Sequence, residues 1–337
     1  MCTYTFVGDV NETKSLYPAV YSITAELDSC GKLCRYERSG QYDRRRKNKD
    51  DKQSVASISK IMTAVIAIEH GKLDEAFTVD EEINKAYGSS VYLKQGQTVT
   101  LRDLLYALML RSGNDAAVEI AKHVSGSQEA FVEAMNQKAA EIGMSNTTFS
   151  NPSGLDEEDG GNISTANDMA ILMSYAMKNK EFRTITGSKY YTTDWNMRWK
   201  NKNRLLFDYP FTIGGKTGFT KKAGRTLVTA AEHDGVESIV VTLREGDDFA
   251  FHEQKHTEVF QKLDVVTIMK KGSYTVNGRT FQVPETVKVT LHKDGSDKLR
   301  VKTHYDHKDF VVEVQKNKDV SVYSFASKRA RGGGLFS

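Results

Sequence analysis

Hydrophobic residues dominate the stretch from 57 to about 69, which predicts a helix. The apolar positions recur at helical spacing and also wrap most of the way around the helix axis, a pattern typical of a helix buried on nearly every side. A His-Gly pair at 70–71 ends the pattern. Three polar residues, Ser57, Ser59 and Lys60, stand where this apolar helix begins, and their presence there needs a reason. The apolar positions are Ile58, Ile61, Met62, Val65, Ile66 and Ile68.

Helical periodicity predicts further helices along the chain. Thr100 is the expected N-cap of the next one, and Ser164 or Thr165 is the expected cap of a later one. The tripeptide Ser112-Gly113-Asn114 interrupts the pattern, and Asp115 begins the helix that follows it. The predicted ranges are 101–110, 115–124, 127–143, 164–179 and 252–264.

Alternating apolar and polar positions predict strands in three parts of the chain. Residues 18–38 break at a glycine and are consistent with a hairpin that turns at 28–31, followed by a charged loop at 39–53. Residues 211–243 are expected to form antiparallel strands joined by glycine-containing turns. After about residue 270 short strands follow one another, an Asn-Gly pair marks a hairpin turn, and no long helix is predicted.

These elements predict an α+β domain, in which helices pack on an antiparallel sheet, and a second domain of strands alone. We expect the α+β domain to span 18–265, after an N-terminal extension at 1–17. The small all-β domain is expected at 271–326. The basic and then glycine-rich segment at 327–337 is expected to be disordered.

The composition is that of a globular protein. The chain has 337 residues, of which 39% are hydrophobic and 27% charged, and this length can bury one large and one small core. A net charge of +3 gives no argument for nucleic acid, and the most basic stretch, 44–52, is diluted by acids and is read as a solvated loop. No run of about 18 apolar residues predicts a membrane span, and no signal peptide opens the chain.

Three cysteines in a chain of this length do not form a disulfide framework. Cys30 falls in the predicted turn of the first hairpin and Cys34 in a strand, which is poor geometry for a bridge. No second pair of Cys or His with ligand spacing is found, so no metal site and no cofactor are expected. Cys2 is either a boundary residue or the remnant of a lipid-attachment site.

Ser57 and Lys60 are the first candidate catalytic residues. They are three residues apart and so share one face of the predicted helix. A serine hydroxyl is a weak nucleophile that needs a base within hydrogen-bond reach. Lys60 can be that base when neutral, and burial among apolar neighbours would lower its pKa, as would a second cation, for which Lys216 is the candidate. At a helix start the N–H of Ser57 is free to donate to an oxyanion. Alternatively, Ser57 is an N-cap and Lys60 extends to solvent.

A second motif, Ser112-Gly113-Asn114, lies in the predicted break between two helices. The hydroxyl of Ser112, placed between two lysines, can relay a proton to a leaving amine. The amide of Asn114 can hydrogen-bond both a catalytic lysine and a carbonyl of the substrate. Alone, this tripeptide is as typical of a turn and helix cap as of a catalytic site.

A third motif, KTGFT, lies on a predicted strand. Lys216, Thr217 and Thr220 offer a cation and hydroxyls that suit a substrate carboxylate. Gly218 lets a ligand backbone approach the strand closely, and the N–H of Phe219 is the candidate second oxyanion donor. By itself, Lys-Thr-Gly in a strand is usually a surface turn.

The order and the settings of the three motifs are much rarer than any one of them, and they are typical of penicillin-binding proteins and serine β-lactamases. Over 18–265 the sequence resembles the D-alanyl-D-alanine carboxypeptidases, which are low-molecular-weight penicillin-binding proteins of the serine peptidase type. The small β domain is also typical of that family. The matching stretches are ASISKIMTA at 56–64, LKQGQTVTLRDLLYALMLRSGNDAA at 93–117, NPSGLD at 151–156, STANDMA at 164–170 and IGGKTGFTKKAGRTLV at 213–228.

The resemblance implies a β-lactamase/transpeptidase-like fold and a defined reaction. Ser57 is acylated by a peptidoglycan stem peptide ending in D-Ala-D-Ala, D-alanine leaves, and the acyl-enzyme is hydrolysed; β-lactams acylate the same serine. A basic residue on the helix after the sheet helps to bind the terminal carboxylate in this family. Lys255 is the nearest match, with His252 and Arg244 as rivals.

Some features depart from the family pattern. The loop at 39–53 is longer and more charged than the segment that usually precedes the nucleophile. Family members carry a signal peptide and a C-terminal amphipathic anchor, and neither pattern is found in the sequence. We therefore expect an extracytoplasmic enzyme, at the bacterial cell surface or in the periplasm, whose native form is held at the membrane by a segment absent here.

Other functions remain open on the sequence alone. A class A β-lactamase would need a glutamate on a loop between the second and third motifs, and Glu157 and Glu158 lie near that place in an unexpected setting. An endopeptidase that cuts crosslinks would use the same chemistry. A binder with little turnover, such as a β-lactam sensor or a wall scaffold, is a further alternative, and binding of nucleic acid is a remote one.

Overall fold

The computed structural model describes residues 2–8, 49–156 and 161–329. Two compact units are found. Among the described residues, the first comprises 2–7, 49–156, 161–232 and 237–257, and the second comprises Gly8, 233–236 and 258–329. The predicted hairpin at 18–38, with Cys30 and Cys34, and most of the predicted loop at 39–53 lie outside the described residues.

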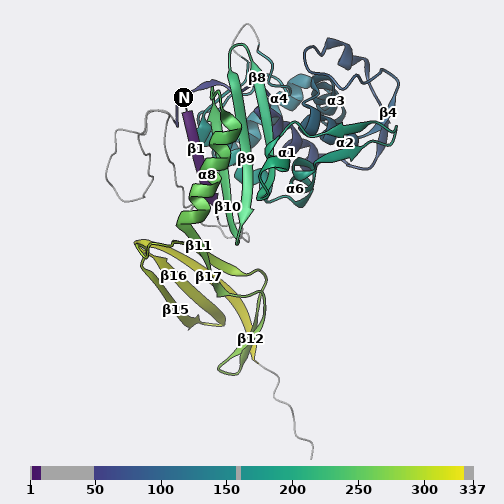
Figure 1. Ribbon diagram of the computed structural model, residues 1–337. Helices are drawn as coiled ribbons and strands as arrows, with labels where there is room; N and C mark the ends of the chain where they lie inside the picture. Colours follow the sequence, from purple (N-terminus) through teal and green to yellow (C-terminus); the bar gives the residue numbers. More distant parts are fainter. Residues whose placement is uncertain (1, 9–48, 157–160, 330–337) are drawn as a thin grey trace, which may run out of the picture. The chain divides into compact units, whose positions relative to one another are not determined.

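A four-stranded sheet forms the centre of the first unit (Figure 1). Its order is β1-β10-β9-β8, so β8 is an edge strand. The antiparallel pairing of β8 with β9 places Lys216 opposite Val228, as the strand prediction for 211–243 requires. β1 lies within 1–17, where the sequence pattern indicated no strand. The strands are β1 (Cys2–Gly8), β8 (Thr212–Thr220), β9 (Gly224–His233) and β10 (Val236–Leu243).

Both faces of this sheet are covered, because every residue of β10 is buried. α8 (Asp248–Lys262) packs on one face. There the hydroxyl of Thr229 lies 2.7 Å from Nδ1 of His252 and 2.8 Å from Nε2 of His256. α8 begins before the predicted range because Asp248, in its first turn, suits the positive end of a helix even though the apolar pattern is weak there.

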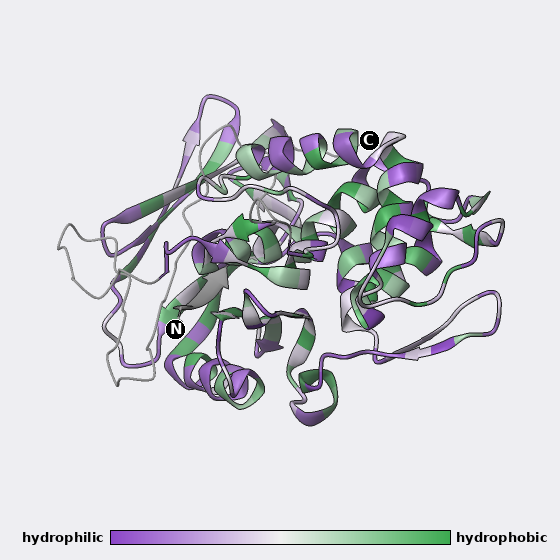
Figure 2. Cartoon of the chain, turned by 90° about the horizontal axis from the view of Figure 1, so that it is seen from above, coloured by the Kyte–Doolittle hydropathy of each residue, from purple (hydrophilic) through white to green (hydrophobic). Residues whose placement is uncertain are grey.

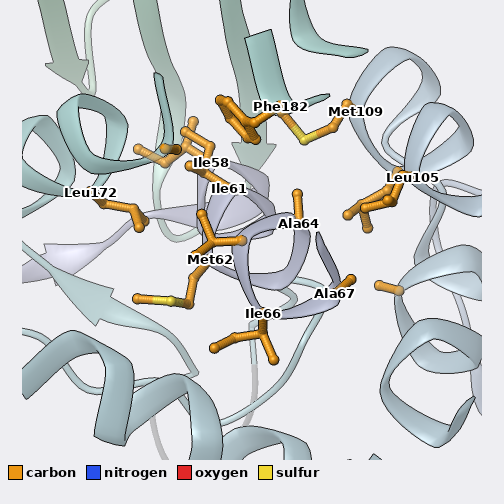
Figure 3. Close-up of a cluster of buried hydrophobic side chains, with 14 of the residues drawn as sticks. Ile58, Ile61, Met62, Ala64, Ile66, Ala67, Leu105, Met109, Leu172 and Phe182 are labelled. Carbon is orange, nitrogen blue, oxygen red and sulfur yellow. The ribbon is translucent and has the colours of Figure 1, made fainter. Parts of the chain in front are cut away.

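The predicted buried helix is present as a 3-10 turn, η2 (Ala56–Ser59), that leads into α1 (Lys60–His70). All residues of α1 from Lys60 to Ala67 are buried, so the prediction of burial on nearly every side is confirmed. The core around α1 also contains side chains from α2 (Leu101–Tyr106), η4 (Ala107–Arg111), α5 (Ala166–Met177) and α6 (Lys180–Gly187). Figure 3 shows Ile58, Ile61, Met62, Ala64, Ile66 and Ala67 among Leu105, Met109, Leu172 and Phe182.

The helices that were predicted after α1 are present in the predicted order, and α6 and α7 are found in addition. The hydroxyl of Thr100 accepts the N–H of Asp103, and of the two later candidates Thr165 caps its helix by accepting the N–H of Asp168. Figure 2 shows polar and apolar colours alternating along the helices, as expected where one side is buried. The helices are α2 (Leu101–Tyr106), which continues into the π-helical turn η4 (Ala107–Arg111), α3 (Asn114–Ser125), α4 (Gln128–Glu141), α5 (Ala166–Met177), α6 (Lys180–Gly187) and α7 (Leu205–Asp208).

The sequence pattern did not indicate α6 or α7. Short strands and a 3-10 turn complete the first unit. They include three two-stranded pairs, β2 with β5, β3 with β4, and β6 with β7. Their bounds are β2 (Gln53–Ser54), β3 (Ala76–Thr78), η3 (Glu81–Lys85), β4 (Thr98–Thr100), β5 (Ile163–Ser164), β6 (Tyr190–Thr192) and β7 (Arg198–Lys200).

The second unit is built of strands after α8 ends. β11 pairs with β14, and a five-stranded sheet has the order β12-β13-β17-β16-β15. Phe281, Phe310, Val312 and Phe325 form its separate core. The strands are β11 (Leu263–Met269), β12 (Gly272–Val276), β13 (Arg279–Val283), β14 (Val287–His292), β15 (Leu299–Asp306), β16 (Asp309–Lys316) and β17 (Asp319–Arg329).

The predicted α+β class is confirmed by this arrangement of helices on an antiparallel sheet, with a unit of strands after it. Among the helices of the described residues, none combines the length and the apolar character that crossing a bilayer requires.

Candidate active site

The structure brings the two groups of the first motif together. Ser57 lies in the 3-10 turn and Lys60 begins α1, and the Nζ of Lys60 is 3.0 Å from the Oγ of Ser57. The Lys60 side chain is completely buried. It does not extend to solvent, so the alternative interpretation of the first motif is wrong on this point.

Three oxygen atoms surround the Lys60 amine. Besides Ser57 Oγ, they are the Oδ1 of Asn114, at 2.7 Å, and the backbone carbonyl of Ser153. The Nδ2 of Asn114 donates to the carbonyl of Tyr87, which turns Oδ1 toward Lys60. Two of the three oxygens are therefore pure acceptors, and the Ser57 hydroxyl is the one that can also donate. A neutral Lys60 has two N–H groups, which donate to these two acceptors, and one lone pair, which accepts the hydrogen bond of the Ser57 hydroxyl. All three oxygen atoms then have a hydrogen bond with Lys60.

The electrostatics favour that neutral form. Burial, with a smaller contribution from the charge of Lys202, lowers the pKa of Lys60 to about 7, while Asp115 acts in the opposite direction. Burial also holds the pKa of Lys216 well below its ordinary value, with Lys60 and Lys202 adding to the effect. Lys216, the second cation expected beside Lys60, repels it in the structure, since the charge of Lys60 lowers the pKa of Lys216. Lys202 is a further cation that acts on Lys60 and that the sequence pattern did not indicate.

Ser112 and Lys216 form the second pair of the site. The Nζ of Lys216 is 3.0 Å from the Oγ of Ser112 and 2.7 Å from the carbonyl of Thr217. Ser112 follows the π-helical turn η4 and has a left-handed backbone, with φ of 65°. This break in the helix directs Ser112 to Lys216, whereas Asn114, at the start of α3, reaches Lys60.

Gly218 allows β8 to pack directly against the serine turn. A Cβ at this position would stand 2.4 Å from Oγ1 of Thr226 and 3.0 Å from the backbone nitrogen of Ser57. The hydroxyl of Thr226 in turn donates to the carbonyl of Val55, at 3.0 Å, and ties β9 to the same turn. The close approach that the sequence analysis expected of a ligand is thus made by the protein itself.

Thr217, Phe219 and Thr220 continue the β8 edge. Thr217 is half-buried, and the Phe219 ring is 67% exposed. The Thr220 hydroxyl donates to Oδ1 of Asp156, at 3.0 Å, and accepts the N–H of Ala223. Because both hydrogen bonds hold the β8–β9 turn in place, Thr220 has a structural task that the sequence analysis did not foresee.

The three candidates for the carboxylate-binding base, Lys255, His252 and Arg244, lie on α8 or just before it. Lys255 is buried, with its Nζ 5.4 Å from the centroid of the Phe251 ring. His252 is buried between Thr229 and the hydroxyl of Thr242, and its pKa is held well below the ordinary value by burial and by His256. Arg244, which precedes α8, donates from its Nη2 to the carbonyl of Lys222. Lys202 is an exposed cation whose charge lowers the pKa of both buried lysines.

The loop at 151–156 supplies a part of the site that had no assigned role in the sequence analysis. The Oδ1 of Asn151 accepts the N–H groups of Ser153 and Gly154, which fixes the Ser153 carbonyl beside Lys60. The resemblance to family stretches covered this loop, but a backbone carbonyl has no side-chain signature. Glu157 and Glu158, named for a β-lactamase, lie outside the described residues.

Comparisons with known proteins agree with this geometry. Residues 45–246 match the family model described as D-alanyl-D-alanine carboxypeptidase. The chain is 33% identical to the D-alanyl-D-alanine carboxypeptidase DacF of Bacillus subtilis over 81% of this chain and 75% of that protein. A solved DD-transpeptidase from a Streptomyces strain is similar with a TM-score of 0.57 at 33% identity, covering 63% of this chain and 88% of that one.

A second solved structure is similar over a larger part of the chain. Penicillin-binding protein 5 from Haemophilus influenzae matches 84% of this chain and 92% of its own with a TM-score of 0.65, at 23% identity. The family match spans well over half of the chain, and the Bacillus subtilis relative exceeds 30% identity over most of it. The expected resemblance is confirmed, and the chain belongs to the D-alanyl-D-alanine carboxypeptidase family of serine peptidases.

Proposed function

We propose that the protein removes the terminal D-alanine from peptidoglycan stem peptides through an acyl-enzyme on Ser57, and that β-lactams acylate the same residue. The observation that carries the proposal is the buried Lys60, 3.0 Å from the Ser57 hydroxyl and with a pKa of about 7. A base is most effective when its pKa lies near the working pH, because it is then unprotonated without being too weak to accept a proton.

Acylation starts when neutral Lys60 accepts the proton of Ser57. The freed oxygen attacks the carbonyl carbon of the penultimate D-alanine, and the negative charge moves to the carbonyl oxygen. The N–H groups of Ser57 and Phe219 stabilise that oxyanion. The amide C–N bond then breaks, and the leaving amine takes a proton through Ser112, which lies 3.0 Å from Lys216. Water hydrolyses the resulting ester and regenerates Ser57.

The terminal carboxylate of the substrate is bound by Lys216 and Thr217. Lys216 is buried, and its pKa is strongly lowered in the protein alone. An incoming carboxylate favours the charged form of the amine, so that substrate binding and protonation of Lys216 are coupled. Asn114 accepts a hydrogen bond from Lys60 at its Oδ1, and its amide nitrogen donates to the carbonyl of Tyr87. The second N–H of that nitrogen is the one that would bond the amide carbonyl of the substrate.

The setting of the reaction follows from the same family membership. Its substrate is a cell-wall polymer, so we propose that the enzyme acts outside the cytoplasm, and that its native form is held at the membrane. Cleavage of crosslinks by the same catalytic groups is the second activity to be measured.

Intact-mass spectrometry after incubation with a penicillin, followed by peptide mapping, tests the nucleophile. One adduct on Ser57 is expected, together with release of D-alanine from an acyl-D-Ala-D-Ala peptide. Ser57→Ala should lose both. The matched control is Ser59→Ala, because the Ser59 hydroxyl is buried and donates to the carbonyl of Ala56. An adduct on Ser57→Ala would remove Ser57 as nucleophile, and labelling without D-alanine release would favour a β-lactam sensor.

A further inference from the structure

The hairpin of β6 and β7 has one buried side and one exposed side, as strand alternation requires. Tyr191 points inward, where its ring stacks on Tyr106 at 3.6 Å and its hydroxyl donates to Asp103. Tyr190 lies opposite Lys200 in the pairing and shares the outer side with it. The outer side of the hairpin thus presents a ring and cations to solvent.

Aromatic rings hold these cations in place. The Nζ of Lys200 is 4.5 Å and that of Lys189 is 5.7 Å from the centroid of the Phe207 ring. The guanidinium of Arg198 lies 4.7 Å from the Tyr190 centroid, and the Tyr190 and Phe207 rings meet edge to face at 5.7 Å. Cation–π contacts position a charge without neutralising it, so the charges stay available to an anion.

The row of cations continues to the catalytic lysines. The Nη1 of Arg111 donates to the carbonyl of Lys200, and the N–H of Lys202 donates to the carbonyl of Leu110. Lys202 is exposed, and its charge acts on both Lys60 and Lys216. A continuous positive field therefore runs from the hairpin into the site. We call this surface the cationic face and define it as Arg111, Lys189, Arg198, Lys200 and Lys202, with the rings of Tyr190 and Phe207.

Few acids oppose this charge. Within the described part of the chain, the five cations of the cationic face form no ion pair with a carboxylate. Asp208 lies near Phe207 but pairs with Arg204, and Asp194 is in the hairpin turn. The protein as a whole carries a net charge of only +3, so five unpaired cations on one surface are a local feature.

We propose that the cationic face binds the carboxylates of an acidic peptide chain and guides that chain to Ser57. The inference rests on the proposed function, because the occupant is the substrate polymer itself. Two features favour this occupant: its carboxylates complement the charge, and the surface is continuous with the catalytic site. A surface that carries one sign of charge beside a cleft raises the local concentration and the association rate of an oppositely charged ligand, and salt weakens the effect.

The test compares two substrates and two variants. The substrates are an N-acyl-D-Ala-D-Ala peptide without other charges and the same peptide extended at its amino end by three glutamates. The variant Arg198→Gln/Lys200→Gln removes two charges from the cationic face. The control Lys94→Gln/Lys180→Gln removes two exposed lysine charges elsewhere, so that both proteins have the same net charge. Penicillin labelling measures how much of each protein has an intact site, and the single variant Lys200→Gln replaces the double if that fails to fold.

We expect kcat/KM for the glutamate peptide to fall about 3- to 10-fold in the first variant, through KM, and to change less than about 2-fold in the control, at low salt. The difference should vanish near 0.5 M salt, where the screening length falls to a few ångströms. Equal losses for both peptides, or in both variants, would overturn the proposal.

A binding measurement separates this inference from the proposed function. Fluorescent hexaglutamate should bind the unmodified protein and lose affinity in the first variant. If hexaglutamate binds in this way but neither peptide releases D-alanine, the carboxypeptidase proposal fails and the cationic face stands. If vesicles rich in phosphatidylglycerol bind and hexaglutamate does not, the occupant is a membrane and the inference is wrong.

Discussion

The amide oxygen of Asn114 lies 2.7 Å from the Nζ of Lys60, and the amide nitrogen of the same side chain donates to the carbonyl of Tyr87. The hydrogen bond to the Tyr87 carbonyl thereby fixes the orientation of the Asn114 amide, with its oxygen toward Lys60. With the Ser153 carbonyl as a second acceptor, the amine has one remaining partner, Ser57. The chemistry of the site follows from this satisfied set of contacts.

The rate of acylation should depend on the protonation of Lys60. Its pKa is about 7, and a protonated amine has no lone pair to accept the Ser57 proton. We therefore expect the second-order rate constant for penicillin acylation to fall about tenfold per pH unit below 7 and to level off above it. Stopped-flow measurements between pH 5 and 9 give this profile. A rate that is flat across pH 7 would exclude Lys60 as the base.

Replacing Lys202 should move that profile. Lys202→Gln removes a positive charge that lowers the pKa of Lys60, so the midpoint should shift to higher pH by a few tenths of a unit or more. Lys94→Gln, an exposed lysine elsewhere on the first unit, is the control and should leave the midpoint in place. A shift to lower pH would show that Lys202 does not act through its charge.

Asn114→Asp tests the same site with the opposite sign. A carboxylate beside Lys60 stabilises its charged form and raises its pKa. Acylation at pH 7 should then be at least about tenfold slower and should recover in part above pH 9. Asn114→Ala removes the contact without adding a charge, so it should slow acylation without this recovery. Equal pH profiles for the two variants would mean that the Asn114 contact does not tune Lys60.

Gly154 should be intolerant of a side chain, because it has φ of +79° and a Cβ there would stand 2.1 Å from the carbonyl oxygen of Ala56. Gly96 has nearly the same backbone, φ of +81°, with nothing within 4 Å of a Cβ. Gly96→Ala should therefore lose about 1 to 2 kcal/mol of stability from the left-handed backbone alone. Gly154→Ala should lose about 3 kcal/mol or more and should also slow acylation, since the Ser153 carbonyl must shift. Urea unfolding and penicillin labelling measure the two effects.

The buried histidines of α8 should make the first unit sensitive to acid. Burial lowers the pKa of His256 from 6.5 to about 3. Between pH 6.5 and pH 3, His256 is therefore protonated in the unfolded chain and neutral in the folded protein. The contribution to the free energy of unfolding is thus fully present above pH 6.5 and falls as the pH drops, by about 1.4 kcal/mol per unit for His256.

His256→Gln should flatten that dependence between pH 6.5 and 4, as seen by chemical unfolding at several pH values. His307→Gln, which removes an exposed histidine of the second unit, is the control. An unchanged slope in His256→Gln would mean that other groups govern acid unfolding.

Local features of this protein were predictable from its sequence because they depend on neighbours in the chain. The burial of α1 and the approach of Lys60 to Ser57 follow from helical spacing, and the cap Thr100 follows from its place before a periodic segment. The structure chose Thr165 over Ser164 as the later cap. Likewise, the family resemblance is a property of short stretches around three motifs. The sequence alone therefore determined the fold class, the family and the residues to examine.

The tertiary structure decided how those residues are surrounded. The charge of Lys202, which follows β7, lowers the pKa of both catalytic lysines. The carbonyls of Tyr87 and Ser153 are backbone atoms, which no side-chain pattern indicates. The hydroxyl of Thr220 donates a hydrogen bond to Asp156. Lys255, the nearest match to the basic residue of the family, is buried on α8, and its part in binding the carboxylate stays a prediction. Charges and carbonyls act through space over a few ångströms, and which of them come within that range is settled when distant segments pack together.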